Sequence, residues 1–506
     1  MAHDLVHAYN RKSLTYCAGI ISNDCRLIRF NILVGQMGTI DVLPDEVLLA
    51  IFDFSVFKYE ILDSREFDEY DIERKIEWWQ SLVRVCRRWR CLVFGSPRRL
   101  NLQLQLYYDY ELPTRTVTRT LDVWPTLPLL IWGDVTDRSG DDVIAGLGHR
   151  DRICQINLRC SKSSNFEKLW TGMQVPFPEL EILRLSVGGS TAPRLPDSFL
   201  GGSAPRLRSL TLDSIPFPGL PKLLLSATHL VKLSLYVGYI SPGAMVTCLS
   251  VLTRLEELYF QFKFLRPSSD QESRRPPPLT RSVLPALKDF SFQGVSEYLE
   301  KFVTQIDTPR LSYLSTEFFN DIDFDTTGLN QFISRTATLG AFDEASLIFY
   351  NDGAQVLLRQ SQHQPSDGRT VNVVISSDRQ PSTLAQICTL SLRHLLLTME
   401  NLYIFSPLLR NRIDNTEWLD LFLPFTAVKN LYLSGTSSSP IALALQELTR
   451  GRTKEVFPAL QNILLEEGFQ PSEPVQKAIE GFISARQLAG HPVAISVWDI
   501  FSSLGS

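Results

Sequence analysis

Arginine, tryptophan and cysteine alternate in the segment WWQSLVRVCRRWRCLVF (78–94), and this mixture could bind nucleic acid. Guanidinium groups pair with phosphates, and aromatic rings stack on bases. The arginines of such a site would be Arg84, Arg87, Arg88, Arg90, Arg98 and Arg99. However, the net charge of −5 and the pI of about 5.9 provide no overall attraction to a polyanion. We therefore expect no nucleic-acid partner.

Patterns of catalysis and metal binding are missing from the sequence. The seven histidines are scattered without an H-E-x-x-H pair, and the eight cysteines include no C-x-x-C pair. Neither a phosphate-binding G-x-x-x-x-G-K-[ST] loop nor a G-x-S-x-G nucleophile turn occurs. We therefore expect a non-catalytic protein with no catalytic residues, no metal and no cofactor.

Length and composition indicate a large globular protein. A chain of 506 residues exceeds one ordinary core, and 44% hydrophobic with 21% charged residues is typical of folded proteins. The first residues lack the long apolar stretch of a signal peptide, and no window reaches the ~20 apolar residues of a membrane span. We expect a protein of the cytoplasm or nucleus, without membrane contact and with reduced cysteines.

Two amphipathic helices must position the arginines. The first begins at Pro44, where proline and the following acidic residues favour a helix start. Its apolar residues share one face: Val47, Leu48, Ile51 and Phe52. The second is predicted as one continuous helix over 78–94, with an apolar face of Leu82, Val85, Cys86, Trp89, Leu92 and Val93. Between them lies an acidic insertion, expected to be solvated or to lie over the arginines.

An apolar-x-x-apolar-x-apolar pattern repeats through the rest of the chain. The clear copies are ICQINL (153–158), LEILRL (180–185), LRSLTL (207–212), LVKLSL (230–235), LEELYF (255–260) and LKDFSF (287–292). Weaker copies are LSYLST (311–316), LRHLLL (392–397), VKNLYL (428–433) and LQNILL (460–465). Helical segments separate them, as in SPGAMVTCLSVL (241–252), where Ser241 is suited to cap a helix and Pro242 to begin it. The pattern predicts an α/β leucine-rich-repeat solenoid with a parallel sheet inside and helices outside.

Residues that alternate with the buried leucines would project from the other face of this sheet. This row contains Arg184, Ser209, Thr211, Lys232, Ser234, Tyr236, Glu257, Tyr259, Gln261, Tyr313, Tyr432 and Asn462. Because tyrosine and arginine are frequent in binding hot spots, we predict that a protein substrate contacts Arg184, Tyr236, Tyr259, Tyr313 and Tyr432. The alternative is that they are ordinary strand residues covered by their neighbours.

The two N-terminal helices resemble the F-box, whose pattern is a Leu-Pro start, an apolar helix and then Val-Cys-x-x-Trp. The matching residues are Leu43, Pro44, Ile51, Phe52, Val85, Cys86 and Trp89. The chain departs from a compact F-box in the insertion 53–77. It is similar in this respect, and in its irregular repeats, to an expanded group of fungal F-box proteins.

The resemblance implies a substrate-recognition subunit of an SCF-type cullin-RING ubiquitin ligase. Its F-box would dock on a Skp-type adaptor, and through it on cullin and RING subunits, while the repeats hold an unidentified protein substrate. The adaptor-binding residues implied are Leu43, Pro44, Val47, Leu48, Ile51, Phe52, Val85, Cys86 and Trp89. The alternative is a non-ligase leucine-rich-repeat scaffold whose helices only cap the solenoid.

The resulting domain organisation has four parts. Residues 1–38 are an N-terminal extension without assigned structure, and 39–96 are the F-box with its insertion. Residues 97–150 are connecting strands that lead into the solenoid, and 151–506 are the leucine-rich-repeat-like domain.

Overall fold

A computed structural model of the chain describes residues in two compact units, 1–101 and 102–506. The described ranges are 43–55, 78–97, 99–100, 102–108, 121, 126–160, 163–188, 194–236, 240–262, 281–319, 326–340, 342–350, 353–360, 368–376, 380–405, 415–434, 438–448, 456–467 and 472–498. The N-terminal extension and nearly all of the acidic insertion therefore lie outside the described residues.

The first unit is helical in its described part, with α2 (Asp45–Ser55), α4 (Trp78–Val83) and α5 (Arg87–Gly95). The prediction of one continuous helix over 78–94 is wrong, because the chain turns between α4 and α5. The amides of Arg84 and Val85 bond to carbonyls three residues earlier, which ends α4. Cys86 is then extended, with φ −154°, and its Sγ accepts a hydrogen bond from the Trp89 amide to start α5.

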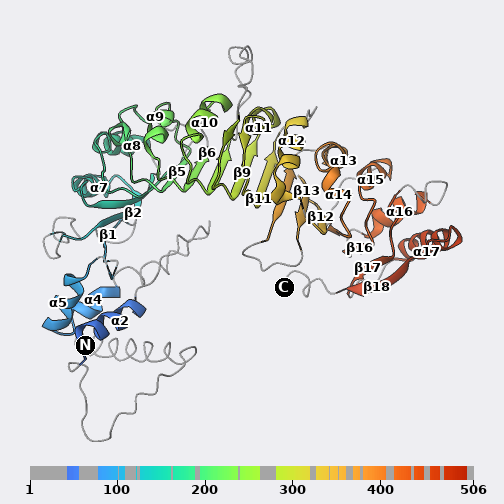
Figure 1. The fold of residues 1–506 in the computed structure, drawn as a ribbon, viewed down its shortest axis with the longest axis horizontal. Coiled ribbons are helices and arrows are strands. Elements are labelled where there is room, and N and C mark those ends of the chain that lie inside the picture. The colour runs from blue at the N-terminus through green and yellow to red at the C-terminus, as the bar shows by residue number, and fades with distance from the viewer. Residues whose placement is uncertain are drawn as a thin grey trace, which may run out of the picture. The chain divides into compact units, whose positions relative to one another are not determined.

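The second unit is built on one mostly parallel sheet (Figure 1). Its sixteen described strands are β1 (Leu104–Tyr108), β2 (Leu129–Val135), β3 (Ile153–Cys160), β4 (Ile182–Val187), β5 (Ser209–Asp213), β6 (Lys232–Tyr236), β7 (Glu257–Gln261), β9 (Asp289–Gly294), β11 (Tyr313–Phe318), β12 (Glu344–Phe349), β13 (Ala354–Arg359), β14 (Thr370–Ile375), β15 (Asn401–Phe405), β16 (Asn430–Leu433), β17 (Asn462–Glu466) and β18 (Ala494–Trp498). A separate two-stranded sheet pairs β8 (Ser282–Val283) with β10 (Ile306–Asp307).

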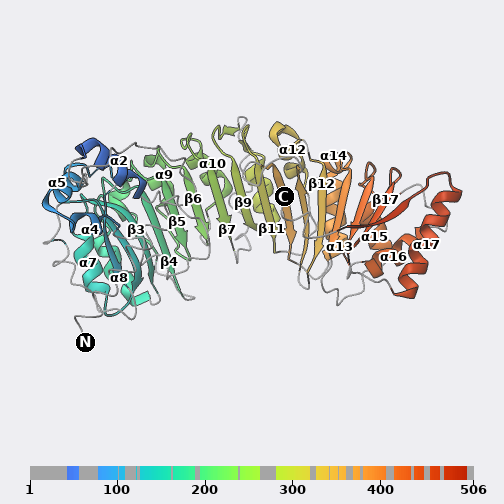
Figure 2. The same ribbon diagram turned by 90° about the horizontal axis from the view of Figure 1, so that it is seen from below.

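Helices connect most of these strands and lie along one face of the sheet in Figure 1, while Figure 2 shows the strands side by side. They are α7 (Gly140–Leu147), α8 (Ser163–Gly172), α9 (Leu220–Ser226), α10 (Pro242–Leu249), α11 (Ser296–Val303), α12 (Thr327–Arg335), α13 (Gln380–Leu390), α14 (Arg393–Leu396), α15 (Asn415–Phe422), α16 (Ser438–Leu448) and α17 (Glu473–Leu488), with short 3₁₀ helices η2 (Phe199–Gly202) and η3 (Ala337–Leu339). The architecture is a leucine-rich-repeat-like solenoid.

The repeat pattern locates most of its strands correctly because it marks the buried side of each. In β4, Leu183 and Leu185 are buried against the helix side while the residues between them are half-buried. The predicted start of α10 is also confirmed, since the Ser241 hydroxyl accepts a hydrogen bond from the Ala244 amide at 3.3 Å.

The segment LRHLLL (392–397) is helical rather than a strand, so this part of the prediction is wrong. Leu392, Leu395 and Leu396 are buried at helical spacing around α14. The strand of this repeat is β15, which follows the same pattern at Met399, Leu402 and Ile404. The pattern matches twice within thirteen residues, and only one match can join the sheet.

The expectation of a fully parallel sheet is also wrong, because β12, β13 and β14 form an antiparallel insertion. β14 pairs in parallel with β11, and β12 pairs in parallel with β15, but β13 is antiparallel to both β12 and β14. The reason is the short connection from Phe349 to Ala354, closed by a 2.7 Å hydrogen bond from the Tyr350 amide to the Gly353 carbonyl. A parallel pair needs a crossover of a dozen or more residues.

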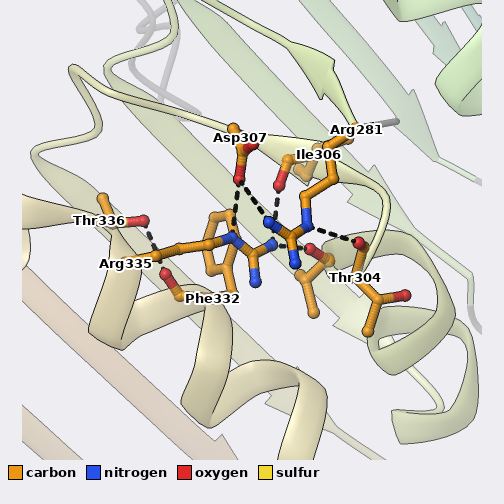
Figure 3. Close-up of polar contacts among 8 residues, drawn as sticks. Arg281, Thr304, Ile306, Asp307, Phe332, Arg335 and Thr336 are labelled. Carbon is orange, nitrogen blue, oxygen red and sulfur yellow. Dashed lines mark hydrogen bonds and ion pairs between the residues drawn. The ribbon is translucent and has the colours of Figure 1, made fainter. Parts of the chain in front are cut away.

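Arginines at helix ends join successive repeats through backbone carbonyls. Arg335, the last residue of α12, donates to the carbonyls of Val303 and Ile306 and pairs with the Asp307 carboxylate at 2.8 Å (Figure 3). Arg486 in α17 is 1% exposed and donates to the Phe457, Pro458 and Leu460 carbonyls at 3.3–3.4 Å. Carbonyls at the turns between repeats thus gain charged donors from the next helix.

Candidate functional site

Helix α2 separates its apolar residues into a buried and an exposed pair. The amides of Val47 and Leu48 both donate to the Pro44 carbonyl at 3.1 Å, which starts the helix at the predicted position. Leu48 and Phe52, four residues apart, are 0% and 1% exposed, whereas Val47 and Ile51 are 41% and 40% exposed. One side of α2 therefore builds the core, and the adjacent side presents two aliphatic side chains.

Aromatic contacts hold the buried side of α2. Phe52 lies edge-on to Trp89 of α5, with ring centroids 4.8 Å apart, and Trp89 is 9% exposed. A second edge-on pair, Trp79 and Phe94, joins α4 to α5 with centroids 5.8 Å apart. Of the predicted adaptor-binding residues, Leu48, Phe52 and Trp89 thus lie in the core of the unit.

The other predicted adaptor-binding residues are at least partly exposed. Pro44 is exposed, Leu43 is half-buried, and Cys86 is half-buried as the cap of α5. Val85 is 57% exposed because it lies in the turn before α5, so the predicted apolar face that joined Val85 to Trp89 does not exist.

Two arginines of the first unit pair with carboxylates of α2. Arg88 of α5 pairs with Asp45 at 2.5 Å and also donates to the Leu43 carbonyl at 2.5 Å, at the start of α2. Arg99 pairs with Asp53 at 2.8 Å, near the end of α2. These two guanidinium groups attach both ends of the helix. Asp53 is the first residue of the insertion 53–77, and the other acidic residues of the insertion lie outside the described residues, as does Arg98.

Two further arginines make local contacts. The Arg84 guanidinium donates to the Gln80 side-chain oxygen at 3.4 Å, and Arg90 donates to the Val83 carbonyl at 3.0 Å. Arg87 is exposed. Four arginines of the predicted nucleic-acid cluster thus contact turns and helix ends of their own unit, namely Arg84, Arg88, Arg90 and Arg99. These contacts are structural.

In the second unit, alternate strand residues lie on the side of the sheet opposite the described helices, which we call the helix-free face. It includes Asn157, Arg159, Arg184, Ser186, Ser209, Thr211, Asp213, Lys232, Ser234, Tyr236, Glu257, Tyr259, Gln261, Asp289, Tyr313, Glu344, Asn401, Tyr403, Asn430, Tyr432 and Asn462. Most of these side chains are half-buried, but Ser209 and Ser234 are buried. On the helix-free face, small serine and threonine side chains therefore alternate with larger polar and aromatic ones.

The predicted substrate contacts fall at separate places on this face. Tyr236 of β6 and Tyr259 of β7 have ring centroids 4.7 Å apart, and Arg184 of β4 is aligned with Thr211 of β5. Tyr313 of β11 is aligned with Asp289 of β9. The sheet brings the first three within a few strands of each other, and Tyr432 of β16 belongs to a different group.

Tyr432 joins an aromatic cluster that the sequence patterns missed. Its ring stacks on Tyr403 at 4.1 Å, and Trp498 lies edge-on to both, with centroids 5.3 and 5.7 Å away. Phe405 completes the cluster. Tyr403 was missed because LRHLLL was assigned as the strand, although ENLYIF (400–405) repeats the Asn-Leu-Tyr of KNLYLS (429–434) and could have identified it.

An asparagine ladder and a half-buried carboxylate adjoin these rings. Asn462 donates to Asn430 at 2.7 Å, and Asn430 donates to Asn401 at 2.8 Å, across three strands. Burial, and then the neighbouring Asp343, raises the pKa of Glu344. Burial and the Glu344 carboxylate raise the pKa of the Tyr403 hydroxyl. Both groups therefore favour their protonated, neutral forms more than free side chains do.

A charged row crosses the middle strands. Lys232 of β6 pairs with Glu257 of β7 at 2.9 Å, and Asp289 of β9 is in register with Glu257. Burial, followed by the charge of Glu257, raises the pKa of Asp289. The row thus places one lysine beside two carboxylates.

No cluster of three or more histidine, cysteine or acidic side chains that could hold a metal occurs in the described part of the chain. Within the same residues, no helix is long and apolar enough to cross a membrane. The described cysteines are free thiols, and Cys388 is buried, which raises its pKa to about 12.

Comparisons with known proteins do not assign a family. No family model matches the sequence, and no curated protein matches it. Among solved structures, the chain is similar to the leucine-rich repeat-containing protein LegL7 from Legionella pneumophila, with 11% sequence identity and a TM-score of 0.23 over 75% of this chain and 97% of that chain. The solenoid assignment is based on the strand pattern and sheet pairing of the chain itself, and such a fold suggests a protein-interaction scaffold.

Proposed function

We propose that the chain is the substrate-recognition subunit of an SCF-type cullin-RING ubiquitin ligase. Residues 39–96 act as an F-box that docks on a Skp-type adaptor, and the solenoid holds a protein substrate. The subunit performs no chemistry. It raises the local concentration of substrate lysines near the ubiquitin-carrying enzyme, as tethering does in any two-site assembly. Such a ligase would act in the cytoplasm or nucleus.

The exposed aliphatic pair on α2 is the observation that carries this proposal. Val47 and Ile51 are four residues apart, next to the exposed Pro44, while Leu48 and Phe52 on the adjacent side are buried. Two apolar side chains on one side of a helix can insert into an apolar groove between helices of a partner protein. The F-box-like Leu-Pro and Val-Cys-x-x-Trp residues add to this support.

The anchoring contacts also support a docking role. Arg88 and Arg99 attach the two ends of α2, so the exposed pair is presented with little loss of backbone freedom on binding. Both ion pairs are partly exposed, so each contributes only about 0.2–1 kcal/mol to stability. Their role is to fix the position of α2, with the aromatic core supplying most of the stability.

Co-purification of the intact chain with its cellular partners tests the proposal. We expect a Skp-type adaptor and a cullin among the recovered proteins, and Leu43→Ala combined with Pro44→Ala should reduce both. A matched control, Leu225→Ala with Leu443→Ala, removes exposed leucines of α9 and α16 and should leave recovery unchanged. Recovery of other partners without adaptor or cullin would favour the non-ligase scaffold.

A further inference from the structure

Arg184 on β4 is a cation with two unpartnered donor atoms. Its Nε and Nη2 atoms are buried, and neither has a hydrogen-bond partner among the described residues. Its strand neighbours in register are the neutral Asn157 on β3 and Thr211 on β5. A buried donor of a charged group without an acceptor is costly, so native proteins seldom retain one without a reason.

Other arginines of the solenoid show what a structural role looks like. Arg335 donates to the carbonyls of Val303 and Ile306 and to the Asp307 carboxylate, which fixes the turn between two repeats. Within the described residues, Arg184 makes none of these contacts, and it lies in the middle of a strand, away from the helix ends. Stabilisation of the repeat therefore does not account for its guanidinium.

A second arginine lies beside Arg184 on the helix-free face, and Asp134 of β2 is the neighbour of that arginine in register. Arg159 on β3 is exposed on the same face and is a diagonal neighbour, because Arg159 is in register with Ser186 while Arg184 is in register with Asn157. Diagonal neighbours on one face lie about 7–8 Å apart at the backbone. The carboxylate on the next strand, Asp213, already accepts hydrogen bonds from the hydroxyls of Ser186 and Ser214, both at 3.0 Å.

An aromatic pair lies a few strands away on the same face. Tyr236 and Tyr259 are on β6 and β7, two and three strands from Arg184, which corresponds to about 10–14 Å at ~4.8 Å per strand. The small Thr211 and the buried Ser234 lie between them. An extended segment that rises ~3.3 Å per residue would cross this distance in about three or four residues.

We propose that this part of the helix-free face binds an extended acidic segment of a protein partner. An aspartate or glutamate carboxylate pairs with Arg184, and Arg159 adds a second positive charge. An apolar side chain about three or four residues away rests on Tyr236 and Tyr259. The inference rests on the proposed function in one respect: the acidic segment would belong to the substrate of the ligase.

Selection of random linear peptides from a phage-displayed library against the full chain tests this inference. We expect selected peptides to share an acidic residue and an apolar residue at that spacing, and a representative peptide to bind about tenfold or more weakly to Arg184→Gln, because a charge-assisted pair is lost. Arg184→Lys should recover only part of the affinity, since an ammonium is more strongly hydrated than a guanidinium and loses more on leaving water. Arg310→Gln, the same charge change at an exposed turn, is the matched control.

Several results would overturn the inference. These are the absence of selected peptides, selected peptides without acidic enrichment, or equal affinity for the wild-type chain and Arg184→Gln. Circular dichroism confirms that each variant is folded, and Arg184→Lys serves if Arg184→Gln does not fold. Adaptor binding, measured on the same proteins, should not change, so failure of this inference and failure of the ligase assignment give different results.

Discussion

Substitution of Trp89 by alanine should unfold the first unit locally while the solenoid remains folded. Trp89 is 9% exposed and lies edge-on to Phe52. Removing a buried tryptophan costs about 3–5 kcal/mol, of which the aromatic contact contributes about 0.5–1.5 kcal/mol. The Trp89 Nε1 has no hydrogen-bond partner in the described part of the chain, so the loss is one of packing.

Hydrogen exchange read by mass spectrometry measures this effect segment by segment, which matters because a chain of two units need not unfold in one step. A loss of about 3 kcal/mol corresponds to roughly hundredfold faster exchange in peptides from α2 and α5. Val85→Ala is the control, since this side chain is 57% exposed and surface changes stay within about 0.5 kcal/mol. Equal exchange in Trp89→Ala and wild type would refute the placement of Trp89 in the core.

Two further predictions concern the solenoid. Arg335→Gln should lower the stability of the α11–α12 repeat by about 1.5–3 kcal/mol, because the Val303 and Ile306 carbonyls lose a charged donor. Hydrogen exchange in α11 and α12 should accelerate, and unchanged exchange would contradict the role of this arginine. Asp289→Asn should raise the thermal midpoint at neutral pH, because burial and Glu257 raise the pKa of Asp289 and its charged form opposes folding. This advantage should shrink as the pH falls through the raised pKa and wild-type Asp289 becomes protonated, and an advantage that grows in acid would show that the sign is wrong.

The sequence patterns predicted those parts of the fold that depend on local burial. The alternation of leucines located β3 to β7, and the Ser241-Pro242 start located α10, because burial on one side and capping are decided by nearby residues. The same pattern could not choose between LRHLLL and ENLYIF, since a helix with buried Leu392, Leu395 and Leu396 satisfies it as well.

The remaining differences arise from pairing over longer distances. The antiparallel insertion of β12 to β14 depends on which strand β11 selects, and no local pattern encodes this choice. The break before α5 depends on the Cys86 cap, an uncommon residue in that role. The partners of Arg88 and Arg99 lie more than forty residues earlier in the chain, so the sequence suggested a solvated arginine face instead.

The affinity of the full chain for a purified Skp-type adaptor, with and without Val47→Asp and Ile51→Asp, tests the proposed docking most directly. Both side chains are about 40% exposed, so the double variant should keep its hydrogen-exchange protection in α5. We predict that the wild-type chain binds and that the double variant loses at least about a hundredfold in affinity, because two charges would be placed in an apolar contact. The control Leu225→Asp with Leu443→Asp should bind like wild type. Absence of binding by the wild-type chain, or equal binding by the double variant, would contradict the account.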